Sequence, residues 1–85
     1  MDAEPRQDTV PVRLAEIWRE ALEVANVRGD SDFFELGGHS LLAIRVSVRA
    51  SETFGVEVPS GDLIADSSFR AMAERIEAAR HEVAA

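Results

Sequence analysis

Apolar residues recur at helical spacing in three separate stretches of the chain, and this periodicity is the feature that most constrains its fold. In the first stretch they fall at i, i+3, i+4, i+7, i+8 and i+11, which is one face of an amphipathic helix; they are Leu14, Ile17, Trp18, Ala21, Leu22 and Ala25. Asp8 or Thr9 is placed to cap this helix, with Pro11 in its first turn, where a missing N–H costs nothing.

Two further helices and a short one are predicted downstream. The second helix runs over residues 40–54, from Ser40 as N-cap or first-turn residue to a stop at Gly55. A brief extended piece over 56–59 precedes one short helical turn over 60–65. Ser67 or Ser68 then caps a last helix, whose apolar face is Phe69, Met72, Ala73, Ile76 and Ala79. No pair of strands is convincing, so the expected fold is all-α: a four-helix bundle of three main helices and a short one, with a long first loop.

The length of 85 residues predicts a single domain. We expect a flexible leader over 1–8, the folded domain over 9–80 and a frayed tail over 81–85. The polar, acidic N-terminus lacks the layout of a signal peptide, and no apolar run approaches the roughly 18 residues that a membrane span needs. These features predict a cytoplasmic protein that does not bind membranes.

Composition removes several classes of site. Without Cys, the chain has no disulfide framework, no thiolate metal site and no cysteine nucleophile. A net charge of −7 argues against a nucleic-acid groove, which needs clustered positive charge. His39 and His81 are the only imidazoles, so a closed zinc site would need carboxylates placed by chance, and we predict no metal site.

Residues 26–39 show no sustained period and form a loop that is long for a small domain. Because Phe33, Phe34 and Leu36 lie within it, we expect these apolar side chains to pin the loop to the core. Asp32 is expected to cap or order the same loop.

The helix predicted over 40–54 has two apolar faces at 100° per residue. The arc assigned to the core holds Leu42, Ala43, Val46, Ala50, Thr53 and Phe54, and the roughly opposite stripe holds Leu41, Ile44 and Val48. Either this helix is central, or the second stripe faces solvent as a partner site. The alternative is that Leu41 or Ile44 folds under the long loop.

Charge singles out the same helix. With Arg45 and Arg49 against Glu52, residues 40–54 carry a net charge of +1, whereas the segments on either side are net negative. Ordinary scatter in a small sample would also give this distribution. We interpret it as a face that another protein reads.

The segment Leu36-Gly37-Gly38-His39-Ser40-Leu41 carries the most chemical information. It places a serine at a helix N-terminus, where unsatisfied N–H groups and the helix dipole favour an anion such as a phosphate ester. The preceding glycines allow close approach to the backbone. Taken alone, a serine here is also explained as a plain helix cap.

Residues 32–43, Asp-Phe-Phe-Glu-Leu-Gly-Gly-His-Ser-Leu-Leu-Ala, closely resemble the attachment motif of the peptidyl carrier (thiolation) domains of non-ribosomal peptide synthetases. The resemblance extends over about residues 10–80. It implies a four-helix bundle whose Ser40 becomes a 4′-phosphopantetheine ester, with Gly37, Gly38, His39 and Leu41 as the surrounding motif. A phosphopantetheinyl transferase would supply the arm from coenzyme A, and the terminal thiol of the arm would hold an aminoacyl or peptidyl group as a thioester.

The resemblance also implies partners. An adenylation enzyme or domain would load the arm, and condensation, tailoring or thioesterase enzymes of natural product biosynthesis would receive the acyl group. Contacts after the serine, here Leu41 and Ile44, engage the transferase and its neighbours in this family. Together with Arg45 and Val48 they are the predicted recognition face of a monomeric carrier.

Other interpretations remain. Acyl carriers share the fold but typically have Asp before the serine and an acidic second helix, so His39 and the positive helix favour the peptidyl branch over an acyl carrier. An aryl carrier stays open. A hydrolase is disfavoured, because adjacent His39 and Ser40 rarely give a nucleophile–base geometry and the Gly-x-Ser-x-Gly elbow is absent. We assign no catalytic residue, His39 included. A helical adaptor without a prosthetic group leaves the Gly37–Leu41 motif unexplained.

Overall fold

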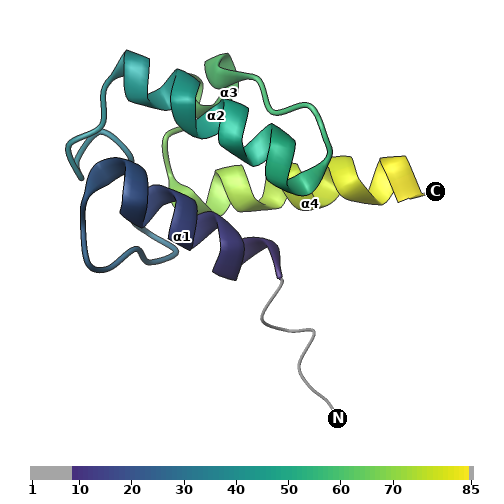
Figure 1. Ribbon diagram of the computed structural model, residues 1–85, viewed down its shortest axis with the longest axis horizontal. Coiled ribbons are helices and arrows are strands. Elements are labelled where there is room, and N and C mark those ends of the chain that lie inside the picture. The colour runs from purple at the N-terminus through teal and green to yellow at the C-terminus, as the bar shows by residue number, and fades with distance from the viewer. Residues whose placement is uncertain (1–8, 85) are drawn as a thin grey trace, which may run out of the picture.

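The computed structural model describes residues 9–84, with side chains up to residue 82, and contains four helices in this range (Figure 1). They are α1 (Val10–Leu22), α2 (Ser40–Phe54), α3 (Ser60–Ala65) and α4 (Phe69–Ala84). No strand forms in the described part of the chain, where the only β-type pairing is an isolated bridge between Asp32 and Ser68. The predicted all-α bundle with one short helix is confirmed.

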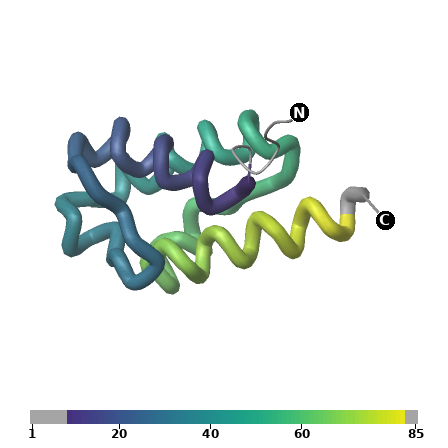
Figure 2. Tube along the Cα trace, turned by 90° about the horizontal axis from the view of Figure 1, so that it is seen from below, coloured from purple at the N-terminus to yellow at the C-terminus, as the bar shows by residue number. Residues whose placement is uncertain are grey.

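The helices pack around α1. It contacts α2 and α4 and runs in the opposite direction to both, while α3 lies against α2 (Figure 1). The long loop between α1 and α2 folds over the end of the bundle that is remote from the C-terminal end of α4 (Figure 2). Ser40 begins α2 where this loop ends, so the loop determines how the serine is presented.

An aromatic cluster forms the centre of the core. Trp18 is fully buried, and its ring centroid lies 5.1 Å from those of both Phe33 and Phe69, in edge-to-face contacts. Because Trp18 comes from α1, Phe33 from the long loop and Phe69 from α4, this cluster ties the loop to two helices. The prediction that Trp18 belongs to the core is confirmed.

Local sequence signals set the helix ends. The Thr9 hydroxyl accepts a hydrogen bond from the Val12 amide at 3.4 Å and caps α1, which decides between the two predicted caps. Gly55 ends α2 in the left-handed conformation, with φ of 72°. The Ser68 hydroxyl accepts from the Ala71 amide at 3.2 Å at the start of α4.

Three expectations about burial were wrong. Thr53, assigned to the core arc of α2, is exposed, while Ser47 takes a place in the core that the apolar pattern did not include. Ala25 is exposed because α1 has already ended at Leu22, with Glu23 in the left-handed conformation. Phe34, predicted to pin the loop, is 37% exposed, whereas Phe33 is fully buried and Leu36 partly buried.

The predicted domain limits fall partly beyond what the structure describes. The leader over 1–8 and residue 85 lie outside the described residues, and the helical backbone of α4 continues to Ala84, through most of the predicted tail. The bounds therefore stay a prediction. None of the helices in the described range has both the length and the apolar character needed to cross a membrane.

Candidate functional site at the start of α2

Ser40 is the first helical residue of α2, and its side chain is exposed. In the described part of the chain, the backbone N–H groups of Ser40 and Leu41 have no hydrogen-bond acceptor. Free first-turn amides and the helix dipole suit an anionic group beside the serine. An exposed hydroxyl next to two unpaired amides therefore fits a phosphodiester on Ser40.

The cap of α2 is His39 and not Ser40. His39 is extended, with φ of −149° and ψ of 177°, and its ring atom Nδ1 accepts from the Leu42 amide at 3.4 Å. Its carbonyl accepts from the Ala43 amide at 2.8 Å, which is the first backbone bond of the helix. Sequence reasoning missed this role because histidine is not among the preferred capping residues.

Two glycines shape the approach to His39. Gly37 has φ of 104°, a left-handed value that is strained for any residue with a side chain. An added Cβ would meet no other atom within 4 Å, so the constraint is one of conformation alone. Gly38 instead lies against Phe33, and its N–H donates to the Phe33 carbonyl at 2.9 Å. The chain thus turns back over the buried Phe33 ring before it enters α2.

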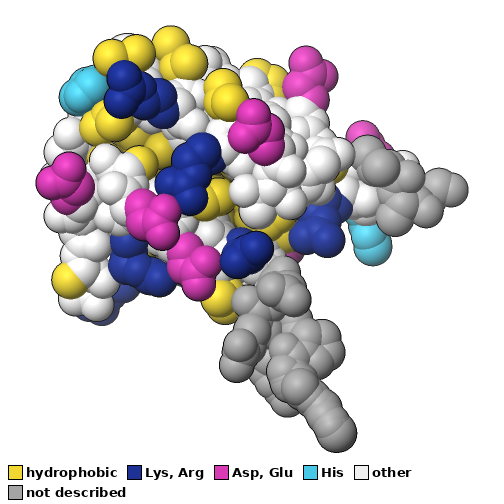
Figure 3. All heavy atoms as spheres, in the orientation of Figure 1, with side chains coloured by type: hydrophobic (Ala, Val, Ile, Leu, Met, Phe, Trp, Pro, Cys, Tyr) yellow, Lys and Arg dark blue, Asp and Glu magenta, His cyan; other side chains and the backbone are white. Residues whose placement is uncertain are grey.

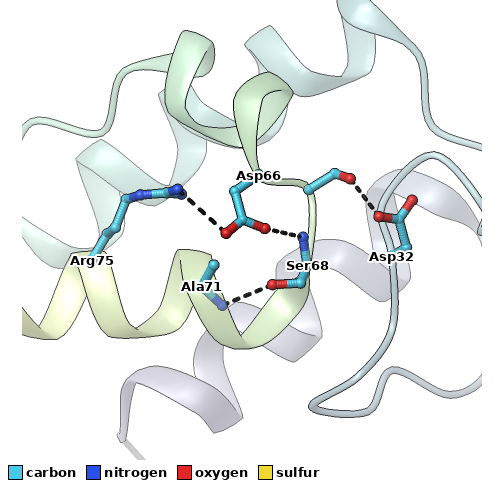
Figure 4. A network of polar contacts seen from close by, with 6 residues as sticks. Asp32, Asp66, Ser68, Ala71 and Arg75 are labelled. Carbon is cyan, nitrogen blue, oxygen red and sulfur yellow. Dashed lines mark hydrogen bonds and ion pairs between the residues drawn. The ribbon is translucent and has the colours of Figure 1, made fainter.

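Asp32 orders the loop, as predicted. Its carboxylate accepts hydrogen bonds from the amides of Phe34 and Glu35, both at 3.0 Å. It also accepts one from the Ser67 hydroxyl, which is the bond drawn to Asp32 in Figure 4. The Ser67 hydroxyl is the main cause of a lowered pKa of Asp32, and the two backbone amides also lower it. Asp32 is therefore held as the carboxylate that fixes the turn over residues 32–35.

Backbone bonds fasten the same loop to the start of α4. The Phe33 amide donates to the Ser67 carbonyl at 2.8 Å, and the Phe69 amide donates to the Ser31 carbonyl at 2.8 Å. Next to this junction, the Asp66 carboxylate accepts a hydrogen bond from the Ser68 amide at 3.4 Å and forms an ion pair with Arg75 at 3.9 Å (Figure 4). The segment before Ser40 is therefore anchored through the aromatic cluster and through this junction.

The second apolar stripe of α2 faces solvent, as one of the two predicted arrangements requires. Leu41 is 53% exposed, Ile44 47% and Val48 51%, so none of them folds under the loop. Arg45 is exposed on the same helix, and hydrophobic and arginine side chains adjoin one another over α2 (Figure 3). All four residues of the predicted recognition face are thus exposed along the first turns of α2, the helix that begins at Ser40.

The arginines of α2 differ in their contacts. Arg49 pairs with Glu20 of α1 at 2.9 Å, so its charge is used within the bundle. Arg45 makes no ion pair with any other residue in the described range. The positive charge available to a partner on this face is therefore small.

The cavity found in the described residues lies away from Ser40. It has a volume of about 290 Å³ and lies between the segment before α3, α3 itself and α4, and none of residues 37–41 lines it. Among the described residues, no three His, Asp or Glu side chains gather as a metal site would require. The exposed side chain of Ser40 leaves room for an attached group.

Comparison with known proteins agrees with this geometry. The sequence model of the family described as "Phosphopantetheine attachment site" matches residues 12–76. The chain is 59% identical over 46 residues to phosphinothricin tripeptide synthetase PhsB of Streptomyces viridochromogenes, and 41% identical over 64 residues to a dimodular nonribosomal peptide synthase of Bacillus subtilis. These alignments cover 54% and 75% of this chain but only 4% and 3% of the relatives, so the chain corresponds to a small part of each.

Solved structures give the same result. The structure of an active-site mutant peptidyl carrier protein superposes with a TM-score of 0.80 at 33% identity, covering 85% of this chain and 80% of that one. A structure of the phosphopantetheine transferase Sfp with coenzyme A and a peptidyl carrier protein matches with a TM-score of 0.77 at 31% identity, covering 92% and 94%. The chain therefore belongs to the phosphopantetheine attachment site family, and it is a carrier domain whose prosthetic group is 4′-phosphopantetheine.

Proposed function

We propose that Ser40 is the attachment serine and that the chain carries aminoacyl or peptidyl groups for non-ribosomal peptide synthesis. The observation that carries the proposal is the place of Ser40: an exposed hydroxyl on the first turn of α2, next to two unpaired amides and reached through the Gly37–Gly38 turn. The arm, when attached, supplies a terminal thiol that holds the acyl group as a thioester. The relatives, which are peptide synthetases, support the peptidyl branch.

The residues of the chain have separate tasks in this proposal. The Ser40 hydroxyl loses its proton, and its oxygen bonds to the phosphorus next to the pantetheine of coenzyme A as the pyrophosphate bond breaks and adenosine 3′,5′-bisphosphate leaves. The amides of Ser40 and Leu41 favour the negative charge of the resulting phosphodiester. The exposed side chains of Leu41, Ile44, Arg45 and Val48 form the recognition face for the transferase. A similar fold in a structure with Sfp and coenzyme A supports this partner.

The same face serves the later partners in this proposal: an adenylation enzyme or domain, then condensation, tailoring or thioesterase enzymes. Three exposed apolar side chains and Arg45, which forms no ion pair with another described residue, make a small patch. A small patch suits contacts that must dissociate after each transfer. We further propose that the carrier is a monomer and acts in the cytoplasm.

Incubation with coenzyme A and a broad-specificity phosphopantetheinyl transferase tests the proposal, with intact mass as the readout. We expect one phosphopantetheine adduct per chain. A folded protein that takes no adduct contradicts the proposal and leaves the adaptor interpretation. Adenylation enzymes specific for amino acids and for aryl acids then separate the peptidyl carrier from the aryl carrier, because only the matching enzyme loads the arm.

A further inference from the structure

His39 provides the only side-chain hydrogen bond to the first turn of α2 within the described residues. Its Nδ1 atom accepts from the Leu42 amide at 3.4 Å. An imidazole nitrogen accepts a hydrogen bond only when it carries no proton, so this contact requires an unprotonated Nδ1. The exposed side chain of His39 thus lies against the first turn of α2.

Little else holds this turn. The amides of Ser40 and Leu41 have no partner among residues 9–84, and the side chains of both residues are exposed. The first fully buried residue of α2 is Ala43. The position of the Ser40 hydroxyl therefore depends on whether the first turn stays wound, and a helix end without its cap frays.

We infer that His39 is a positioning residue for the modification of Ser40. It holds the first turn of α2 through the Leu42 amide, so that the Ser40 hydroxyl meets the transferase in a single arrangement. This inference rests on the proposed function, since it concerns the same serine. His39 takes no part in the bond-forming step, because the contact assigned to it is to the backbone.

The chain offers a matched comparison in Thr9. Its hydroxyl accepts from the Val12 amide at 3.4 Å at the start of α1, so the two caps have the same spacing and bond length and are both exposed. Loss of either cap weakens one helix end. Only the loss of the His39 cap weakens the helix end that bears Ser40.

Four proteins test the inference: wild type, His39→Ala, His39→Asn and Thr9→Ala. The kcat/KM of phosphopantetheine transfer is measured with one transferase, together with urea unfolding. We expect His39→Ala to lower kcat/KM by up to about fivefold, which is the largest fall in the population of the wound turn that loss of a typical cap causes. His39→Asn should stay near the wild-type value, because its amide oxygen accepts in place of Nδ1. Thr9→Ala should lose stability as His39→Ala does, with an unchanged kcat/KM.

The inference is overturned by a His39→Ala protein that is modified at the wild-type rate, or by a Thr9→Ala protein that is slowed as much as His39→Ala. Equal slowing of His39→Ala and His39→Asn also overturns it, since the imidazole itself would then be required. A ¹⁵N spectrum of the His39 ring gives a readout independent of transfer, in which a protonated Nδ1 contradicts the assigned contact. A wild-type chain that takes no arm at all contradicts the proposed function, whereas the spectrum still reports on the cap.

Discussion

Gly38 lies so close to Phe33 that a Cβ at position 38 would stand 2.3 Å from the ring atoms Cδ2 and Cε2 and 2.7 Å from the Phe33 carbonyl oxygen. The ring has no room to move away, since Phe33 is fully buried against Trp18. Gly37 is required for another reason, its φ of 104°. The two glycines before Ser40 therefore meet two separate constraints, one of backbone conformation and one of packing.

Gly38→Ala should destabilise the domain and slow the modification of Ser40. Overpacking against a buried ring costs about 1–3 kcal/mol, and the strain falls on the segment that leads into α2. Urea unfolding measures the loss. Gly61→Ala is the control, because it lies in α3 with nothing within 4 Å of the added Cβ, and alanine favours a helix. Equal stability of the two variants would contradict the packing constraint.

Asp32→Asn should lower stability at neutral pH and flatten its dependence on acid. The pKa of Asp32 is lowered, first by the hydrogen bond from the Ser67 hydroxyl. The carboxylate therefore stabilises the fold at pH values above its ordinary pKa of 3.8. That contribution is lost as the pH falls below this value. At neutral pH we expect a loss of about 1–3 kcal/mol, typical of hydrogen bonds to a charged group.

Unfolding free energies of both proteins between about pH 7 and about pH 2 test this prediction. The wild-type curve should fall towards that of Asp32→Asn in acid. Asp30→Asn is the control, because this nearby exposed carboxylate makes no hydrogen bond with another described residue. Parallel curves for wild type and Asp32→Asn would refute the role of the carboxylate.

Ile44→Asp and Leu41→Asp should slow phosphopantetheine transfer by about tenfold, the effect expected for a central apolar contact. Both side chains are about half exposed, so the helical circular dichroism signal should not change. Val12→Asp is the matched control: Val12 is 44% exposed on α1, outside the proposed recognition face. If Val12→Asp slows transfer as much as the α2 variants do, the added charge and not its position is the cause, which contradicts the recognition face. If the α2 variants unfold, these side chains belong to the core.

Salt should affect the transfer rate only weakly. Arg49 is already paired with Glu20 at 2.9 Å, and the rest of the recognition face is mostly apolar. Since salt at about 0.1 M screens exposed charges beyond roughly 10 Å, only charge-based recognition is strongly weakened by it. The rate is measured from low to high sodium chloride, with an acidic-helix carrier for comparison. A loss as steep as that of the comparison carrier would contradict an apolar recognition face.

Three of the helix ends were predictable because their signals are local, whereas the end of α1 at Leu22 and the His39 cap of α2 were not. Thr9, Gly55 and Ser68 each act on residues within a turn of the helix that they bound. The apolar periods likewise gave the buried faces of α1 and α4. The second apolar stripe of α2 could be recognised in the sequence. Whether it faced solvent or lay under the long loop could not, because that depends on the path of the loop.

Features that depend on distant contacts were not predictable. The Ser67 partner of Asp32 lies 35 residues away, and nothing in either segment indicates the pairing. Phe33 and Phe34 are equivalent in sequence, yet only Phe33 enters the core beside Trp18. Ser47 is buried, and its hydroxyl has no hydrogen-bond partner among the described residues. A pattern of polar and apolar residues places such a serine at the surface.

The central claim, that Ser40 carries the arm, is tested most directly by intact mass after transfer to Ser40→Ala and Ser60→Ala. Ser60 is the matched control because it is also the first residue of a helix. The account predicts one adduct on wild type and on Ser60→Ala, and none on a folded Ser40→Ala. An adduct on Ser40→Ala would contradict it.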